Sequence, residues 1–108
     1  MMTTYKRGTN GMRAIHPGEH LREDFLKPLN MSANALAIAL RLPAPRINDI
    51  VRERRGITPE TAVRLAKYFG TTAQYWMNWQ TTYDLKMAAK KEAKVLSEII
   101  PLNPVATV

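Results

Sequence analysis

Five arginines and one asparagine lie close together near the middle of the chain, in the stretch LRLPAPRINDIVRERRG, and their chemistry suits nucleic acid. A guanidinium group can donate two hydrogen bonds to the O6 and N7 atoms of guanine, and an asparagine amide can pair in the same way with adenine. Further arginines near a helix end can hold phosphate groups. Between Arg41 and Arg55 the five arginines are accompanied by only two acids, Asp49 and Glu53. Positive charge is therefore concentrated in this stretch.

A helix beginning near Pro43 would place these side chains on one surface. Ile47, Ile50 and Val51 recur at helical spacing and predict a buried face. The two prolines of the first turn cost little, because backbone donors there have no partner inside the helix. With about 100° between successive residues, the face opposite the apolar one is polar or charged. The residues expected to read bases are Ala44, Pro45, Arg46, Asn48, Asp49 and Arg52.

A second set of residues is expected to contact the phosphate backbone from the edges of the same surface. These residues are Asn34, Arg41, Arg54, Arg55 and Thr58. The simpler alternative is that the surface is an ordinary charged helix face in water, and the pattern alone leaves both interpretations open.

Short helices must position this surface, and no alternation typical of strands competes with them. The first helix begins at Pro17, and Pro28 marks its end near Lys27. Its apolar face consists of Leu21, Phe25 and Leu29. Ser32 is the expected N-cap of the second helix, whose apolar face consists of Leu36, Ala37 and Leu40. A brief break at Arg41 and Leu42 then leads into the arginine-rich stretch.

Glycine and threonine residues mark the later helix ends. Gly56 is expected to stop the third helix and Gly70 the fourth. The fourth helix starts at Thr58-Pro59-Glu60 with an N-cap, a proline and a first-turn acid, and buries Ala62, Leu65, Ala66 and Phe69. Thr71 and Gln74 predict a capping box before a longer fifth helix. The segment KEAKVLSEII extends this helix until Pro101.

Size and composition agree with one small DNA-binding domain. The chain has 108 residues and a net charge of +7, which suits a polyanionic partner. It has no cysteine, and we read neither a membrane-spanning segment nor a secretory signal, so the cytoplasm is the expected compartment. We expect a flexible basic arm over residues 1–14, a helical domain over 15–91, and a helical extension with a loose tail over 92–108.

Catalytic and metal chemistry are weak alternatives. His16 and His20 are four residues apart beside Glu19, a spacing that can hold a metal, but the order is not that of a zinc-protease helix and no third ligand stands out. A capping or surface role suffices for both histidines. No serine has a plausible histidine and acid partner, so we expect no enzymatic activity, no metal and no cofactor. Asp84 either holds a buried hydrogen bond to a neighbour or faces Lys86 and Arg64 in solvent.

Several motifs occur together and carry a family resemblance. They are HPGE with LRE after it, RIND, RRGIT, and W-x-N-x-Q-x-x-YDL from Trp76 to Leu85. Over residues 15–88 the chain resembles the HigA antitoxin branch of the Xre-type, lambda-repressor-like helix-turn-helix family. The resemblance implies an all-α, five-helix DNA-binding domain with a C-terminal helical extension. It further implies a homodimeric repressor that binds double-stranded operator DNA at its own promoter and neutralises a HigB-type, ribosome-dependent mRNA endonuclease.

Three features of the chain depart from the family pattern. Arg41 stands where a turn glycine is frequent, Trp79 where leucine is usual, and Pro45 where a polar base-contacting residue is frequent. Arg41 will therefore be strained if its φ is positive. Pro45 offers only apolar contact, so Arg46, Asn48 and Arg52 would carry more of the base reading.

The fifth helix and the extension are the expected dimer interface, because their apolar edge is hard to bury within one small domain. The residues assigned to this interface are Trp79, Tyr83, Met87, Val95, Leu96 and Ile99. The N-terminal arm and first helix are the expected toxin surface. Two other functions stay open: a solitary repressor of the same fold without a toxin partner, and a protein-interaction module that binds no DNA.

Overall fold

The computed structural model describes residues 13–102, and every regular element in this part of the chain is a helix. The first helical run consists of α1 (Pro17–His20), the π-helical section η1 (Leu21–Leu26) and α2 (Lys27–Leu29). After it come α3 (Ala33–Leu40), α4 (Ala44–Val51), α5 (Pro59–Phe69), α6 (Ala73–Lys91) and α7 (Ala93–Glu98). The predicted all-α class is confirmed, with the first run as one helix and α7 as the extension. The expected continuation of the fifth helix to Pro101 is wrong, because α6 ends at Lys91 and α7 is a separate short helix that ends at Glu98. The expected arm and tail fall largely on residues 1–12 and 103–108, which lie outside the described residues.

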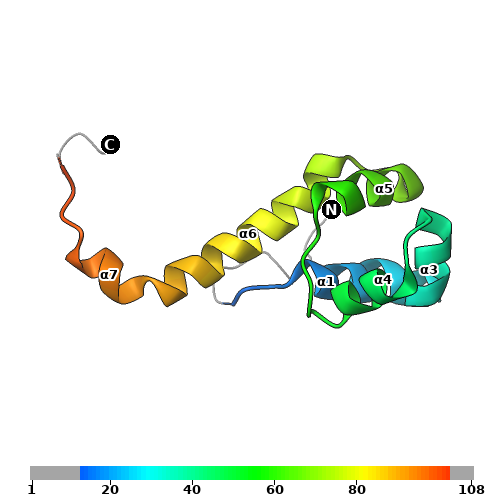
Figure 1. Cartoon of the computed structure of the whole chain (residues 1–108), viewed down its shortest axis with the longest axis horizontal. Coiled ribbons are helices and arrows are strands. Elements are labelled where there is room, and N and C mark those ends of the chain that lie inside the picture. The colour runs from blue at the N-terminus through cyan, green and yellow to red at the C-terminus, as the bar shows by residue number, and fades with distance from the viewer. Residues whose placement is uncertain (1–12, 103–108) are drawn as a thin grey trace.

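The short helices form one group, and α6 extends away from it. Figure 1 shows α1, α3, α4 and α5 together at one end of the molecule, with α6 leading to α7 at the other end. In the group, α1 packs against both α4 and α6, while α3 packs against α4 and α5. The helix pair α3 and α4 is therefore supported from two sides.

The core lies between these short helices and the start of α6. Its fully buried large side chains include Leu21, Leu36, Ile47, Ile50, Leu65 and Trp76. The predicted apolar faces of α3 and α4 are confirmed, since all six of their residues are buried. Leu29 is an exception in the first helix, because it is 57% exposed at the end of α2. Leu26, Leu42 and Ile57 complete the core from positions that helical spacing alone did not indicate.

The first helical run continues past the proline expected to end it. Pro28 lies inside α2, and the run closes at Asn30, which has a φ of 54°. In η1 the bonding is π-helical, and the amide of Lys27 donates to the carbonyl of Arg22 five residues earlier. A π-helical turn already lacks the usual bonds to residues four positions away, so a proline without an N–H group is tolerated directly after it.

The N-caps at Ser32 and Thr58 are confirmed, whereas the one at Thr71 is wrong. Ser32 Oγ accepts from the amide of Ala35 at 3.0 Å, and Thr58 caps α5. For α6 the cap is Thr72, whose hydroxyl accepts from the amide of Tyr75 at 3.0 Å. Thr71 Oγ1 instead accepts from the indole Nε1 of Trp76 at 2.8 Å. The buried indole needs a hydrogen-bond acceptor, and this long-range packing requirement decides which threonine caps the helix.

The two histidines of the first helical run are buried, so a surface role for them is wrong, while the capping role of His16 is confirmed. His16 Nδ1 accepts from the amide of Gly18 at 2.9 Å. Burial lowers the pKa of His16, which keeps the ring neutral and its Nδ1 free to accept. His20 lies 2.7 Å from an Asp24 carboxylate oxygen and 2.6 Å from the Tyr75 hydroxyl. Burial raises the pKa of Tyr75, so the phenol stays protonated in this contact.

Gly18 allows α1 to touch the backbone of α4. A Cβ atom added at Gly18 would lie 1.7 Å from the carbonyl oxygen of Ile50. Neither backbone can yield without moving its whole helix, so only glycine fits here. The glycine of the HPGE motif therefore sets the distance between α1 and the arginine-bearing helix.

We expect Gly18→Ala to lower the free energy of unfolding by about 3 kcal/mol, because the methyl group forces α1 away from α4. Gly70→Ala is the matched control. Gly70 has a φ of +75° and open space around its Cβ position, so its variant should lose only about 1 kcal/mol from backbone strain. Urea unfolding of both variants measures the difference, and equal losses would contradict the close approach.

Candidate nucleic-acid interface

The helix pair α3 and α4 has the geometry of a helix-turn-helix. The connection is only three residues long, and Leu42 within it is buried against the core. Arg41 has a φ of 60°, so the strain expected for a positive φ at this position is present. The amide of Arg41 donates to Ile38 and that of Leu42 to Ala37, which closes the end of α3. Arg64 of α5 supports this turn by donating to the carbonyls of Leu40 at 3.0 Å and Arg41 at 2.8 Å.

The two prolines at the start of α4 occupy the positions that the sequence predicted. Pro43 is the N-cap, with a ψ of 139°, and Pro45 lies in the first turn. The side of α4 that carries Ile47, Ile50 and Val51 is buried in the core, so the helix cannot rotate about its axis. Pro45 and Arg52 are exposed, while Arg46, Asn48 and Asp49 are half-buried.

The end of α4 differs from the expectation, because Gly56 does not stop this helix. The helix ends at Val51, and the left-handed residue that follows is Glu53, with a φ of 64°. The amides of Glu53 and Arg54 donate to the carbonyls of Ile50 and Asp49, a pairing that closes helices in the Schellman motif. Arg52, Arg54 and Arg55 therefore lie on a turn after α4 and not on the helix itself.

Position 56 requires a glycine for a different reason, which is its close contact with Gln80 of α6. A Cβ atom there would lie 2.8 Å from Oε1 of Gln80. That same oxygen accepts from the amide of Ile57 at 2.6 Å, and the Gln80 amide nitrogen donates to Asp84 at 2.9 Å. The buried hydrogen bond considered for Asp84 is not present, because Asp84 is exposed to solvent and accepts its hydrogen bond from Gln80 at the surface. The RRGIT and W-x-N-x-Q-x-x-YDL motifs thus meet in space, and Gln80 holds the chain between α4 and α5.

Arg22 holds the end of α4 from the first helical run. Its guanidinium donates to the carbonyl of Val51, to Glu53 at 3.1 Å and to Glu23 at 2.9 Å. The hydrogen bond to Glu23 is the main cause that raises the pKa of Arg22. The hydrogen bonds from Arg22 and Lys27 lower the pKa of the Glu23 carboxyl in turn. The Arg22 cation interacts favourably with the negative, C-terminal end of the α4 dipole. Its hydrogen bonds to Val51 and Glu53 offset the cost of the left-handed backbone conformation at Glu53.

Several of the predicted contact residues are held by partners within the chain. Asn48 donates to Asn34 at 2.8 Å and to the carbonyl of Ala44 at 2.9 Å, which joins a predicted base reader to a predicted phosphate ligand. Arg54 pairs with Asp49 at 3.1 Å. Arg46 pairs with Glu60 at 2.8 Å. The surface is therefore partly ordered before any ligand arrives.

Arg46 brings α4 and the start of α5 together around one cleft. The cleft has a volume of about 260 Å³ and is lined by Arg46, Arg55, Gly56, Thr58, Glu60 and Thr61. Two predicted phosphate ligands, Arg55 and Thr58, therefore lie beside a predicted base reader. Arg22, Glu60, Arg64 and Gln80 were not among the predicted site residues. Their roles depend on partners 14 to 31 residues away along the chain, and no local pattern indicates such contacts.

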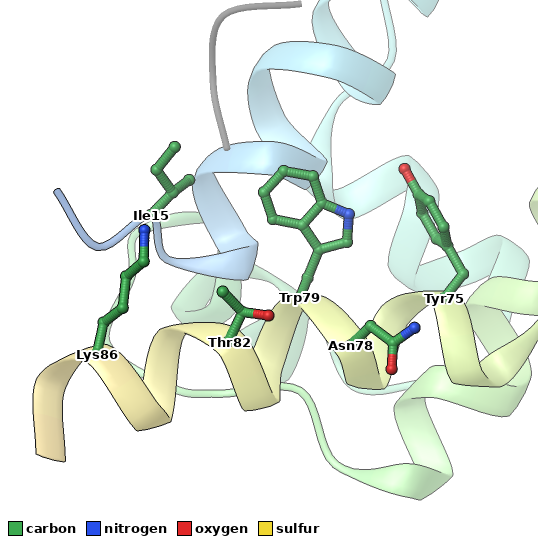
Figure 2. A pocket seen from close by; sticks show the side chains of 6 residues that line it. All are labelled: Ile15, Tyr75, Asn78, Trp79, Thr82 and Lys86. Carbon is green, nitrogen blue, oxygen red and sulfur yellow. The ribbon is translucent and has the colours of Figure 1, made fainter. Parts of the chain in front are cut away.

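The residues assigned to a dimer interface fall into two groups. Trp79 stacks on His20 with ring centroids 3.8 Å apart, and Tyr83 meets His16 edge-on at 4.9 Å, so both contact α1 in their own chain. Figure 2 shows Trp79 between α6 and the first helical run, beside a pocket of about 180 Å³ that is also lined by Ile15, Tyr75, Asn78, Thr82 and Lys86. The second group, Met87, Val95, Leu96 and Ile99, is exposed on the outer part of α6 and on the segment after it.

Metal and membrane sites find no support in the part of the chain that the structure describes. Residues 13–102 contain no group of three His, Cys, Asp or Glu side chains placed to hold a metal ion. No helix in that range combines the length and apolar character that crossing a membrane requires.

Comparison with known proteins gives a consistent result. The family model for helix-turn-helix domains (HTH_3) matches residues 23–76. Virulence-associated protein I of Dichelobacter nodosus is 58% identical over 96 residues, which cover 89% of this chain and 88% of that protein. The solved structure of the Pseudomonas aeruginosa antitoxin HigA with the higBA promoter is 51% identical, with a TM-score of 0.81, and the match covers 84% of this chain and 100% of that one. An addiction module antidote protein of the HigA family from Coxiella burnetii is 47% identical, with a TM-score of 0.79 and coverage of 85% and 100%.

The left-handed end of α4 can be tested by a pair of substitutions at Glu53. Glu53→Gly and Glu53→Ala both remove the carboxylate that pairs with Arg22, but only alanine keeps a Cβ atom at a φ of 64°. We expect the glycine variant to be more stable by about 1 kcal/mol.

The same pair at Arg52, where φ is −89°, is the control. There the order should reverse, because glycine only adds freedom to the unfolded chain. Thermal unfolding compares all four variants. An alanine variant at Glu53 at least as stable as the glycine variant would place the end of α4 elsewhere.

Proposed function

The chain belongs to the helix-turn-helix family, in the branch of the HigA antitoxins, and on this premise we propose that it is an antitoxin and transcriptional autorepressor. It binds operator DNA in its own promoter and neutralises a HigB-type mRNA endonuclease. The observation that carries the DNA-binding part is the outward face of α4, on which arginine and asparagine side chains are presented by a helix whose other side is locked in the core.

The assignment of individual residues to DNA follows from their place around α4. We propose that α4 enters the major groove with its N-terminal part, where Arg46 and Asn48 read base edges and Pro45 gives apolar contact. Arg52 reads from the turn that follows the C-terminal end of α4. The turn after α4 brings Arg54 and Arg55 to the phosphates, and the N-termini of α3 and α5 bring Asn34 and Thr58.

Two subunits would read two half-sites about 34 Å apart on a near-palindromic operator. The surface that suits this dimer is the outer part of α6 with α7 and the residue after it, where Val95, Leu96 and Ile99 are about half exposed. These residues lie beyond the part of α6 that packs on the short helices (Figure 1). An apolar edge of this kind is typical of an interface and not of a surface in water.

The toxin partner and the absence of catalysis belong to the same proposal. The family is a class of DNA-binding proteins and not of enzymes, and we propose that the chain inhibits its partner by binding alone. A protein that binds operator DNA must be in the compartment that holds the genome, so we propose that the chain acts in the cytoplasm of a bacterial cell. A solitary repressor of the same fold would bind the operator equally well and leave the toxin active, so a toxin gene beside this one distinguishes the two.

We expect Arg46→Ala and Asn48→Ala each to weaken binding to the operator by about 1 to 3 kcal/mol and to change binding to scrambled DNA little. Arg55→Ala should weaken binding to both DNAs, because a phosphate contact carries no sequence information. Fluorescence anisotropy at two salt concentrations, with the promoter segment and a scrambled copy, measures all three variants. Equal losses on both DNAs for Arg46→Ala and Asn48→Ala would remove their base-reading role.

The proposed dimer interface predicts that Leu96→Asp gives a monomer and weakens operator binding, since one half-site alone cannot hold the protein tightly. The control is Leu29→Asp, which places the same charge on an equally exposed leucine of α2 outside the interface, 57% against 51% exposed. Sedimentation velocity at several concentrations gives the oligomeric state. A Leu96→Asp protein that is still a dimer would exclude this interface.

A further inference from the structure

Glu60 connects the predicted base reader Arg46 to the rest of the helix-turn-helix. One carboxylate oxygen of Glu60 accepts from Arg46 Nη1 at 2.8 Å. The other oxygen accepts from Arg64 Nη2 at 3.4 Å. The same Arg64 guanidinium donates hydrogen bonds to the carbonyls of Leu40 and Arg41 at the end of α3. A chain of contacts thus runs from the turn before α4, through α5, to a side chain on the outward face of α4.

A carboxylate at this place is unexpected on electrostatic grounds. Glu60 is 54% exposed and lies in the cleft with Arg55 and Thr58, which are proposed to hold phosphates. A negative charge beside the DNA backbone opposes binding to any sequence. The N-terminus of α5 favours a carboxylate in its first turn, but this local benefit does not require the contact with Arg46. The contact itself therefore needs an explanation.

The side chain of Arg46 is already partly ordered in the free protein. It is 29% exposed, and its Nε atom is buried without a hydrogen-bond partner among the described residues. An arginine has five N–H donors, so the bond to Glu60 leaves others for a base edge. A long side chain that is held before binding loses less conformational freedom when it meets the base.

We propose that Glu60 is a positioning residue for sequence recognition, which holds the Arg46 guanidinium ready for a base and couples it through Arg64 to the turn. This inference rests on the proposed function and adds a residue to its recognition mechanism. Glu60 acts through Arg46 and needs no contact with the DNA. Through Glu60, α5 contributes to base recognition, although no base contact is assigned to its residues.

Removal of the carboxylate has two effects on DNA binding that can be separated. Loss of the negative charge raises the affinity for every DNA sequence alike. Loss of the ordered Arg46 weakens binding only where Arg46 reads a base. The ratio of the dissociation constants for scrambled and operator DNA cancels the first effect and reports the second. A change in global stability does not alter this ratio for protein that stays folded.

The test measures this ratio for the wild type, Glu60→Gln and Glu60→Asp. Glutamine keeps the length of the side chain and removes its charge, while aspartate keeps the charge and withdraws it by one methylene group. We expect the ratio to fall about 3- to 10-fold in both variants, the usual effect of having to order one long side chain on binding. Only Glu60→Gln should also bind scrambled DNA more tightly. Circular dichroism confirms that each variant is folded.

The same substitutions in an Arg46→Ala background decide whether Glu60 acts through Arg46. There the ratio should not change further, because the side chain that Glu60 positions is gone. An unchanged ratio in the wild-type background would reduce Glu60 to a general charge effect and overturn the proposal. An equal fall in both backgrounds would also overturn it, since Glu60 would then act by another route. A wild-type ratio of about one would instead refute the sequence-specific binding of this operator on which the proposed function depends, which is a distinct outcome.

Discussion

The backbone contact between Gly18 of α1 and the Ile50 carbonyl of α4 is the constraint on which the candidate interface depends. It sets the depth at which α4 lies on the core, and any larger residue at Gly18 would push the two helices apart. His16 fixes the start of α1 by accepting from the Gly18 amide, and its lowered pKa keeps it an acceptor. One turn later in the same helical run, Arg22 grips the end of α4. The first helical run thus determines both the position and the end of the helix proposed to read DNA.

Both ends of α4 are bordered by residues in the left-handed region that are not glycine. Arg41 precedes the helix and Glu53 follows it, with φ values of 60° and 64°. Such conformations cost about 1 to 2 kcal/mol each for residues with a Cβ atom. Each is supported by an arginine from a different helix, Arg64 at the first turn and Arg22 at the second. Arginines that hold the turns are therefore as necessary to the surface as those that face outward from it.

The long helix α6 serves two regions of the molecule with different parts of its length. Its first turns supply Trp76 to the core and Gln80 to the chain between α4 and α5. Trp79 and Tyr83 then cover the two histidines of the first helical run. Beyond these residues the helix leaves the short helices, and its exposed apolar side chains are available to a second subunit. Trp79 and Tyr83, which the sequence predicted to lie in a dimer interface, thus pack within their own chain.

The sequence by itself determined the features that depend on neighbouring residues. Helical spacing identified the buried faces of α3 and α4, Ser32 and Thr58 marked two helix starts, and Gly70 marked an end, because caps and amphipathic faces act within one or two turns. The same spacing suggested which side chains point outward from α4, and their contacts with DNA stay predictions. The family motifs indicated the fold and function, since several had to occur together at defined intervals.

Only the tertiary structure decided the features that depend on distant partners. Gly56 was expected to end α4, but Gln80 of α6 explains its size and Glu53 takes the left-handed position. Thr71 was expected to cap α6, but its hydroxyl accepts a hydrogen bond from the indole of Trp76 instead. The burial of both histidines and the hold of Glu60 on Arg46 likewise arise between separate helices. Such contacts follow from how the helices pack, and packing brings together residues whose relation no local pattern records.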